Sequence, residues 1–142
     1  MKKITVINGP NLNFLGIREK SVYGNRDYND LIKMIEEAAD KHQIEIDTFQ
    51  SNSEGEIIDK IQQCYFEEVD GIVINPGAYT HYSYAIRDAI ASVNIKTIEL
   101  HISNIHERED FRKISVIEPV CAEQIYGKGL DGYIIAIEHI LK

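Results

Sequence analysis

Residues 71–93 read GIVINPGAYTHYSYAIRDAIASV, and this stretch contains the pattern that decides the fold. It begins with a short β-branched run at residues 72–74, which is typical of a strand buried on both faces. A polar segment with a Pro-Gly turn follows this run. Apolar residues then recur at helical spacing, at Ala85, Ile86, Ala89, Ile90 and Val93. The stretch therefore predicts one unit of strand, loop and helix.

The same unit repeats on either side of this stretch. Short apolar runs at residues 4–7, 46–49 and 97–100 predict three more buried strands, and a fifth strand is expected within residues 116–126. Asp27 is a candidate cap for the first of three further helices. The apolar positions of these helices are Leu31, Ile32, Ile35, Ala38 and Ala39, then Ile57, Ile58, Ile61, Cys64 and Tyr65, and finally Tyr133, Ile134, Ile137, Ile140 and Leu141.

Strict alternation of strand and helix predicts a parallel sheet that right-handed crossovers cover on both faces. The expected fold is a flavodoxin-like α/β three-layer sandwich with a five-stranded parallel sheet. A length of 142 residues fits one domain, so we expect residues 1–142 to share one core and one site.

Composition and charge exclude several classes of function. The formal net charge is -8 at pH 7, whereas a surface that binds nucleic acid normally shows a basic excess. Cys64 and Cys121 belong to no CxxC pair, so neither a zinc site nor a disulfide framework is indicated. The apolar run after Lys3 is too short for a signal peptide or a membrane span, and we expect a cytoplasmic protein.

Polar residues gather just after the predicted strands. They occupy residues 8–13 after the first strand, 75–81 after the third and 101–104 after the fourth. In a parallel α/β sheet, ligands bind beyond the carboxyl ends of the strands, so these segments are expected to converge on one pocket. The connection over residues 8–26 is long, and we expect an active-site lid at about residues 12–26.

The first loop matches none of the common nucleotide-binding motifs. It has neither the GxGxxG spacing nor the lysine of GxxxxGK[ST], and Asn8 stands where a phospho-receiver needs an acidic cluster. The polar set is instead uncharged to cationic, which suits a hydroxylated carboxylate. Its members are Asn11, Asn75, His81, His101, Ser103 and Arg112.

Purely structural interpretations of some of these residues stay open. Asparagines that follow strands often cap turns and helices, and this would explain Asn13 and Asn104 without a ligand. Tyr23 could act only as an aromatic anchor of the lid, because a tyrosine with an ordinary pKa near 10 is ionised to about one part in a thousand at neutral pH. Arg18, five residues earlier, would favour the phenolate and make Tyr23 a base.

Together the motifs resemble those of type II 3-dehydroquinate dehydratase, a shikimate-pathway enzyme, and the resemblance runs essentially from end to end. Each motif is weak alone, whereas the ordered set is specific. Tyr82 departs from the family pattern, which commonly has a small hydroxyl residue there. The motifs are NGPNLN at 8–13, Arg18 with Tyr23-Gly24, INPGAYTHYS at 74–83, AIRDA at 85–89, ELHISN at 99–104, and the glycines before the final helix.

The resemblance implies a mechanism that needs no metal or cofactor. Tyr23 would take a proton from C2 of 3-dehydroquinate, giving an enolate, and Arg18 would lower the pKa of this tyrosine. Asn11 would hold a water near the enolate oxygen. His101 would protonate the departing C1 hydroxyl, oriented by Glu99, and the product would be 3-dehydroshikimate.

The resemblance also implies how the substrate is held and how the chain assembles. Asp88 is expected to reach the site of a neighbouring subunit in a homododecamer built as four trimers. The remaining residues expected to bind the carboxylate and ring hydroxyls are Asn75, His81, Ile102, Ser103 and Arg112, with Ile102 and Ser103 acting through backbone amides.

Two other functions remain as alternatives at this stage. One is a different cofactor-free lyase or hydrolase on the same fold, acting on another hydroxy acid. The other is a non-catalytic metabolite-binding or assembly module. The presence of both Arg18 and Tyr23 favours catalysis, because a binding module has no need of this pair.

Overall fold

The computed structural model of the chain describes residues 1–17 and 25–142. Within them, five parallel strands form one sheet in the order β2-β1-β3-β4-β5. The strands are β1 (Lys3–Asn8), β2 (Glu45–Gln50), β3 (Gly71–Asn75), β4 (Thr97–His101) and β5 (Glu123–Tyr126). The α-helices are α2 (Tyr28–His42), α3 (Glu54–Phe66), α4 (Tyr84–Val93) and α5 (Asp131–Leu141). This arrangement confirms the predicted flavodoxin-like sandwich.

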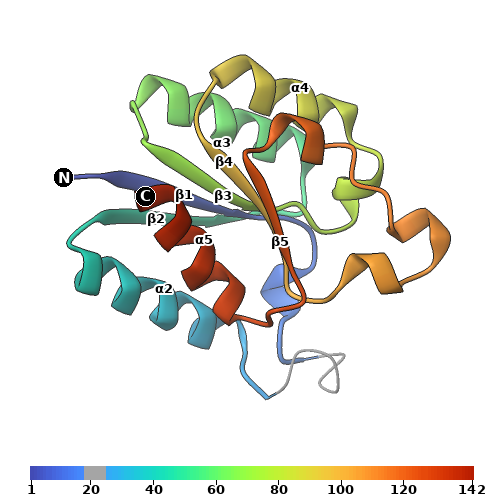
Figure 1. Cartoon of the computed structure of the whole chain (residues 1–142), viewed down its shortest axis with the longest axis horizontal. Coiled ribbons are helices and arrows are strands. Elements are labelled where there is room, and N and C mark those ends of the chain that lie inside the picture. The colour runs from blue at the N-terminus through green and yellow to red at the C-terminus, as the bar shows by residue number, and fades with distance from the viewer. Residues whose placement is uncertain (18–24) are drawn as a thin grey trace.

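The helices cover the two faces of the sheet in pairs. Figure 1 shows α2 and α5 on one face, and α3 and α4 on the other. One apolar core joins α2 and α5 to side chains such as Ile4 and Val73, and the second joins α3 and α4 to side chains such as Ile7 and Ile72. Alternate residues of one strand thus enter different cores, which is why residues 72–74 of β3 are all apolar.

The helix starts follow local capping rules. Asp27 caps α2, as predicted, by accepting a 2.9 Å hydrogen bond from the Asp30 amide, while its own amide donates to the Asp30 side chain. Ser53 and Ser83 cap α3 and α4 by accepting hydrogen bonds from the backbone amides of Glu56 and Ile86. None of the helices in residues 1–17 and 25–142 has the length and apolar character needed to cross a lipid bilayer.

The fifth strand lies within the predicted residues 116–126 as a short strand that begins at Glu123, after a 3-10 helix, η5 (Glu118–Val120). Two details of the predicted pattern are wrong. Strand β2 lies at the edge of the sheet and is only partly buried. Tyr65 lies on α3, but its side chain is 57% exposed and packs edge-on against Phe66 rather than in the core.

After β1 the chain crosses to β2 on one side of it, and after β3 it crosses to β4 on the other side. The two connections therefore leave the neighbouring carboxyl ends of β1 and β3 in opposite directions. This divergence makes the crevice in which α/β sheets bind ligands. The Gly9 amide donates a 2.7 Å hydrogen bond to the Asn75 carbonyl and ties the two departing loops together. A Cβ atom on Gly9 would lie 2.5 Å from the Pro76 carbonyl oxygen, so only glycine fits at this position.

We therefore expect Gly9→Ala to lower the free energy of unfolding by about 1 to 3 kcal/mol, the usual cost of overpacking. Urea denaturation followed by circular dichroism measures this change. Gly55→Ala is the matched control, since its Cβ would be 3.8 Å from the Ser53 hydroxyl, within ordinary contact distance. Equal stabilities of the two variants would show that the β1 and β3 loops can separate without cost.

Candidate active site

A cavity of about 300 Å³ opens at the carboxyl ends of β1, β3 and β4. The loop after β1 contributes Pro10, Asn11, Leu12, Phe14 and Leu15 to its wall. The loop after β3 contributes Asn75, Gly77, Ala78 and His81, and the segment after β4 contributes His101, Ile102, Ser103, Ile105, Arg108 and Arg112. The three polar segments expected from the sequence do converge.

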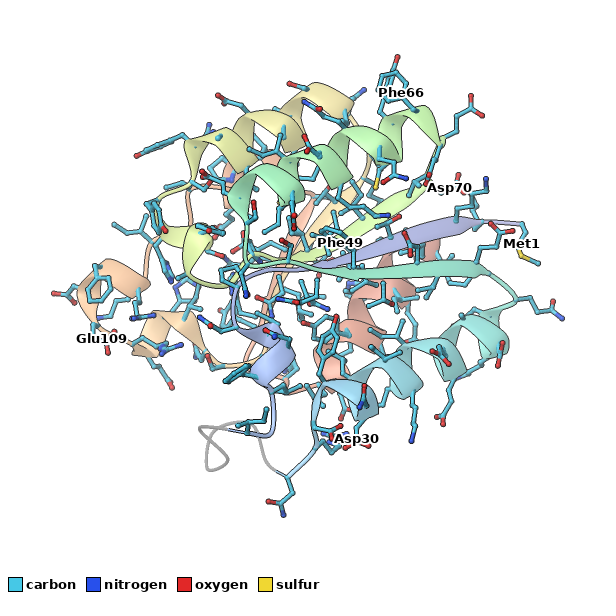
Figure 2. All side chains as sticks on the ribbon, turned by 180° about the vertical axis from the view of Figure 1, so that it is seen from behind. Met1, Asp30, Phe49, Phe66, Asp70 and Glu109 are labelled. Atoms are coloured by element: carbon cyan, nitrogen blue, oxygen red, sulfur yellow. The ribbon has the colours of Figure 1, made fainter. Side chains whose placement is uncertain are left out.

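The cavity lies at one end of the molecule. In Figure 2, Glu109 marks the outer tip of the segment that follows β4, and Met1 and Asp70 mark the opposite end, where the strands begin. The structure therefore separates the amino ends of the strands from the site, and the loops at their carboxyl ends carry the polar side chains.

Asn11 holds an uncommon backbone conformation beside the cavity. Its φ is 70°, in the left-handed region that asparagine tolerates better than most residues. The Asn11 amide donates a 3.0 Å hydrogen bond to the side-chain oxygen of Asn52, which follows β2. Gln50 donates in turn to the Gly9 carbonyl at 3.2 Å. The loop after β2 thus sets the backbone of Asn11.

The Asn75 side chain is fixed by a buried series of hydrogen bonds that was not predicted from the sequence. Its side-chain amide donates to the Tyr133 hydroxyl at 3.1 Å, and this hydroxyl donates to the Asn8 side chain at 2.6 Å. Tyr133 and Asn8 are fully buried. Tyr133 was predicted only as part of an apolar helix face. The available signal was its residue type, because a buried tyrosine usually finds a partner for its hydroxyl.

His101 and Glu99 form a buried pair at the end of β4. The Nε2 atom of His101 lies 2.5 Å from Oε2 of Glu99, and the two side chains are 6% and 0% exposed. Glu99 does not line the cavity, whereas His101 does. Since Nε2 is engaged by the carboxylate, Nδ1 is the nitrogen left for a ligand.

The backbone after β4 is held by two glycines ahead of α5. The Gly129 amide donates to the Ile102 carbonyl and the Gly127 amide to the Ser103 carbonyl, both at 3.1 Å. Both glycines have a positive φ, 62° for Gly129 and 74° for Gly127. The carbonyl oxygens of Ile102 and Ser103 are therefore occupied, and ligand binding through their amide N–H groups stays a prediction.

His81 is poised as an uncharged acceptor. Its Nδ1 donates a 2.7 Å hydrogen bond to the Ile114 carbonyl, which leaves Nε2 without the proton in the neutral ring. Burial lowers the pKa of His81 below its ordinary value, and His101, Arg112 and Arg108 lower it further against the opposing effect of the Ile114 carbonyl. His81 is thus neutral at pH 7 and can accept from a hydroxyl group.

The cavity is cationic although the chain is acidic. Arg108 and Arg112 line it, and no carboxylate does so among the described residues. The Arg112 Nε atom lies 2.7 Å from a Glu109 carboxylate oxygen but is not aligned for a hydrogen bond with it, so we treat the contact as an ion pair alone. Arg108 was not predicted as a site residue, and its place in the same loop as Arg112 was the only signal in the sequence.

Four predicted site residues are not part of the described wall. Glu99 lies behind His101, with which it is paired. Asp88 lies on the exposed side of α4, outside the cavity, so its expected role toward a neighbouring subunit stays a prediction. Arg18 and Tyr23 lie outside the described residues, and their roles also stay predictions.

The electrostatics of the cavity predict how His81 titrates. We expect the pKa of His81 below 6.5, and we expect Arg112→Ala to raise it only in part, because burial is the largest cause of the shift. The measurement is an NMR titration of histidine-labelled protein, with Lys2→Ala as a control cation at the amino end of β1, the opposite end of the strand from the site. An unchanged pKa in Arg112→Ala would show that this guanidinium does not act on the cavity.

Known proteins resemble this chain over nearly its full length, in sequence and in structure. The family model described as Dehydroquinase class II matches residues 2–141. The 3-dehydroquinate dehydratase of Lachnoclostridium phytofermentans is 63% identical over 139 residues, which cover 98% of this chain and 96% of the relative. The crystal structure of type II dehydroquinase from Butyrivibrio crossotus is 65% identical and superposes with a TM-score of 0.98 over 99% of this chain and 98% of that one. The type II dehydroquinase structure from Propionibacterium acnes is 38% identical, with a TM-score of 0.94 over 99% of this chain and 96% of that one. With matches of this extent in sequence and in structure, the chain belongs to the class II dehydroquinase family.

Proposed function

We propose that the cavity at the ends of β1, β3 and β4 is the place where this chain removes water from 3-dehydroquinate. The chain is a type II 3-dehydroquinate dehydratase, a hydro-lyase of the shikimate pathway, by its family match and its near full-length relatives. The observation that supports this placement is the cationic cavity with the buried His101–Glu99 pair at its wall. The product is 3-dehydroshikimate.

The first step is proton abstraction. The C2 proton of the substrate is acidic because it lies next to the C3 ketone, and Tyr23 as its phenolate is the base. Arg18 stabilises this phenolate, and Asn11 holds a water at the enolate oxygen that develops. The roles of Arg18 and Tyr23 rest on the sequence motif, and that of Asn11 is supported by its place in the cavity wall and its fixed backbone.

The second step is loss of the C1 hydroxyl group. Hydroxide is a poor leaving group, so a proton must reach this oxygen as the C–O bond breaks. His101 donates that proton from Nδ1, and Glu99 holds the ring through Nε2. This assignment resembles the role of a buried carboxylate that orients a catalytic histidine in other enzymes.

Substrate binding uses the remaining wall of the cavity. Arg112 and the amide groups of Ile102 and Ser103 hold the carboxylate, and Asn75 and His81 hold ring hydroxyl groups. The fixed amide of Asn75 and the neutral Nε2 of His81 support these choices, because each presents one defined partner to a hydroxyl. We assign no metal or cofactor to the reaction, since proton transfer and general-acid catalysis supply every step.

We further propose that residues 1–142 act as one cytoplasmic catalytic domain, with a lid at about residues 12–26, in a homododecamer of four trimers. Large apolar side chains next to the site support assembly, with Tyr84 66% and Phe111 64% exposed. Asp88 follows Tyr84 by one helical turn and so shares its exposed face of α4. If a neighbouring subunit packs on this face, Asp88 of one chain lies at the active site of the neighbouring subunit.

Tyr23→Phe tests the base directly. The change keeps the ring but removes the group that takes the C2 proton, so turnover should fall at least about a thousandfold while substrate binding stays. Formation of the conjugated enone is followed by ultraviolet absorbance, and C2 hydrogen exchange by NMR in heavy water. Tyr65→Phe, on α3 and away from the cavity, is the matched control. Substantial C2 exchange by Tyr23→Phe would place the base elsewhere.

Coexpression of Asp88→Ala and His101→Ala chains tests the shared site. Each variant alone should have low activity. If Asp88 completes the site of a neighbour, hybrid oligomers with random mixing restore about a quarter of the sites, since each needs an intact pocket and an intact neighbour. Hybrids that stay as inactive as the two parents would contradict the shared site.

A further inference from the structure

We propose that Gln124 and Ser115 are positioning residues that keep Glu99 in its ionised form and so keep His101 fully protonated for the loss of water. This inference rests on the proposed role of His101 as the general acid. It concerns two residues to which the sequence pattern assigned no function. Both lie behind the cavity wall rather than in it.

The Glu99 carboxylate is completely buried but has three hydrogen-bond partners. Oε2 contacts His101 Nε2 at 2.5 Å and accepts from Gln124 Nε2 at 3.0 Å. Oε1 accepts from the Ser115 hydroxyl at 2.9 Å. A buried carboxylate without such donors is strongly disfavoured and takes up a proton instead. Gln124 and Ser115 supply the two neutral donors.

Ser115 can only donate to Glu99 in this arrangement. Its oxygen accepts a 3.1 Å hydrogen bond from the Glu118 amide, so its single proton is directed to the carboxylate. The next residue, Val116, is held on both sides, by its amide to the Thr80 carbonyl and by its carbonyl to Arg87. The backbone next to Ser115 is therefore fixed by hydrogen bonds, and this fixes the position of the Ser115 hydroxyl.

Gln124 is oriented by the sheet and by a second histidine. It pairs with Glu99 in the register of β4 and β5, which places the two side chains on the same face of the sheet. Its side-chain oxygen lies 3.1 Å from Nε2 of His106, whose ring packs edge-on against Tyr126 at 4.6 Å between centroids. The N–H of His106 fixes the oxygen of the Gln124 amide and so turns its NH₂ group toward Glu99.

These two donors decide where the proton of the His101–Glu99 pair resides. With protons on both Nε2 and Nδ1, His101 is an imidazolium, and its Nδ1–H is a far stronger acid than the N–H of a neutral imidazole. With the proton on Glu99, His101 is a neutral imidazole and a very weak acid. Hydrogen bonds to the carboxylate stabilise the first state more than the second, because an ionised carboxylate is a stronger acceptor than a neutral carboxyl group. When Nδ1 gives its proton to the departing hydroxyl, water leaves and His101 keeps the Nε2 proton against Glu99.

The other titratable groups around the pair do not replace these donors. Cys121 is the nearest thiol, and burial, followed by the charges of Glu99 and Glu118, raises its pKa to about 12, so it stays uncharged. His106 acts on Glu99 only through Gln124. His81 faces His101 across the cavity and stays neutral near pH 7 because burial lowers its pKa.

Gln124→Met and Ser115→Ala each remove one donor with little change in shape. We expect kcat to fall about tenfold to a hundredfold in each, the factor that one hydrogen bond to a charged group represents, while KM changes less than about twofold. Ser115→Thr keeps the hydroxyl and should restore most of the activity. Gln63→Met is the matched control, because the exposed Gln63 side chain of α3 donates to the Glu67 carboxylate at 2.7 Å, away from the cavity.

Solid-state ¹⁵N spectra of histidine-labelled protein test the proton position without reference to turnover. At the same pH, the His101 signals should be those of an imidazolium in the native chain and should move toward the neutral ring in Gln124→Met and Ser115→Ala. The His101→Gln spectrum assigns the signals. The ¹⁵N signals of His101 can be measured whether or not the chain dehydrates 3-dehydroquinate. An error in the proposed reaction is therefore distinguishable from an error in the proposed role of Gln124 and Ser115.

Several outcomes would overturn the inference. Native kcat in both Gln124→Met and Ser115→Ala would do so, as would equal losses in Ser115→Thr and Ser115→Ala. An unchanged His101 spectrum in the variants would do so even if kcat falls. If Gln124→Met fails to fold, the Ser115 pair decides the question alone.

Discussion

The hydrogen bond from the Gly9 amide to the Asn75 carbonyl is the contact on which the site depends. It joins the loops that leave β1 and β3 in opposite directions, at the point where the sheet opens a crevice. Gly9 has no side chain to hold the loops apart, and Pro76 fills the space that a Cβ would need. The walls that carry Asn11 and His81 are thereby placed on either side of one cavity.

Charge distribution explains how an acidic chain can take an anionic substrate. A net charge of -8 is spread over the surface, whereas the cavity is lined by Arg108, Arg112 and two histidines. The Glu99 carboxylate lies behind His101 and is surrounded by donors. Its charge therefore acts on His101 rather than on the substrate. Overall net charge excludes partners that bind through extended surfaces, but it says little about a small pocket.

The sequence was sufficient for the architecture and for most of the cavity wall. Buried parallel strands and amphipathic helices leave strong periodic patterns, and polar residues after such strands must meet at one edge of the sheet. The residues that it missed act through contacts between distant elements. Tyr133 fits the apolar period of α5 and yet carries a hydroxyl to Asn8, and Gln124 reaches Glu99 only through the pairing of β4 with β5. The edge position of β2 was also missed, although its charged residues Glu45 and Asp47 are typical of an edge strand.

The buried chain of Asn8, Tyr133 and Asn75 has a consequence for biosynthesis. Asn8 and Tyr133 are 125 residues apart, so the first strand leaves the ribosome long before its hydrogen-bond partner exists. Until α5 docks, the polar side chains at the ends of β1 and β3 lack this buried hydroxyl and stay hydrated. The nascent chain therefore completes this polar network only after residue 133 has been joined and α5 has docked on the sheet. Until then, Asn75 lacks the hydroxyl that accepts its side-chain N–H.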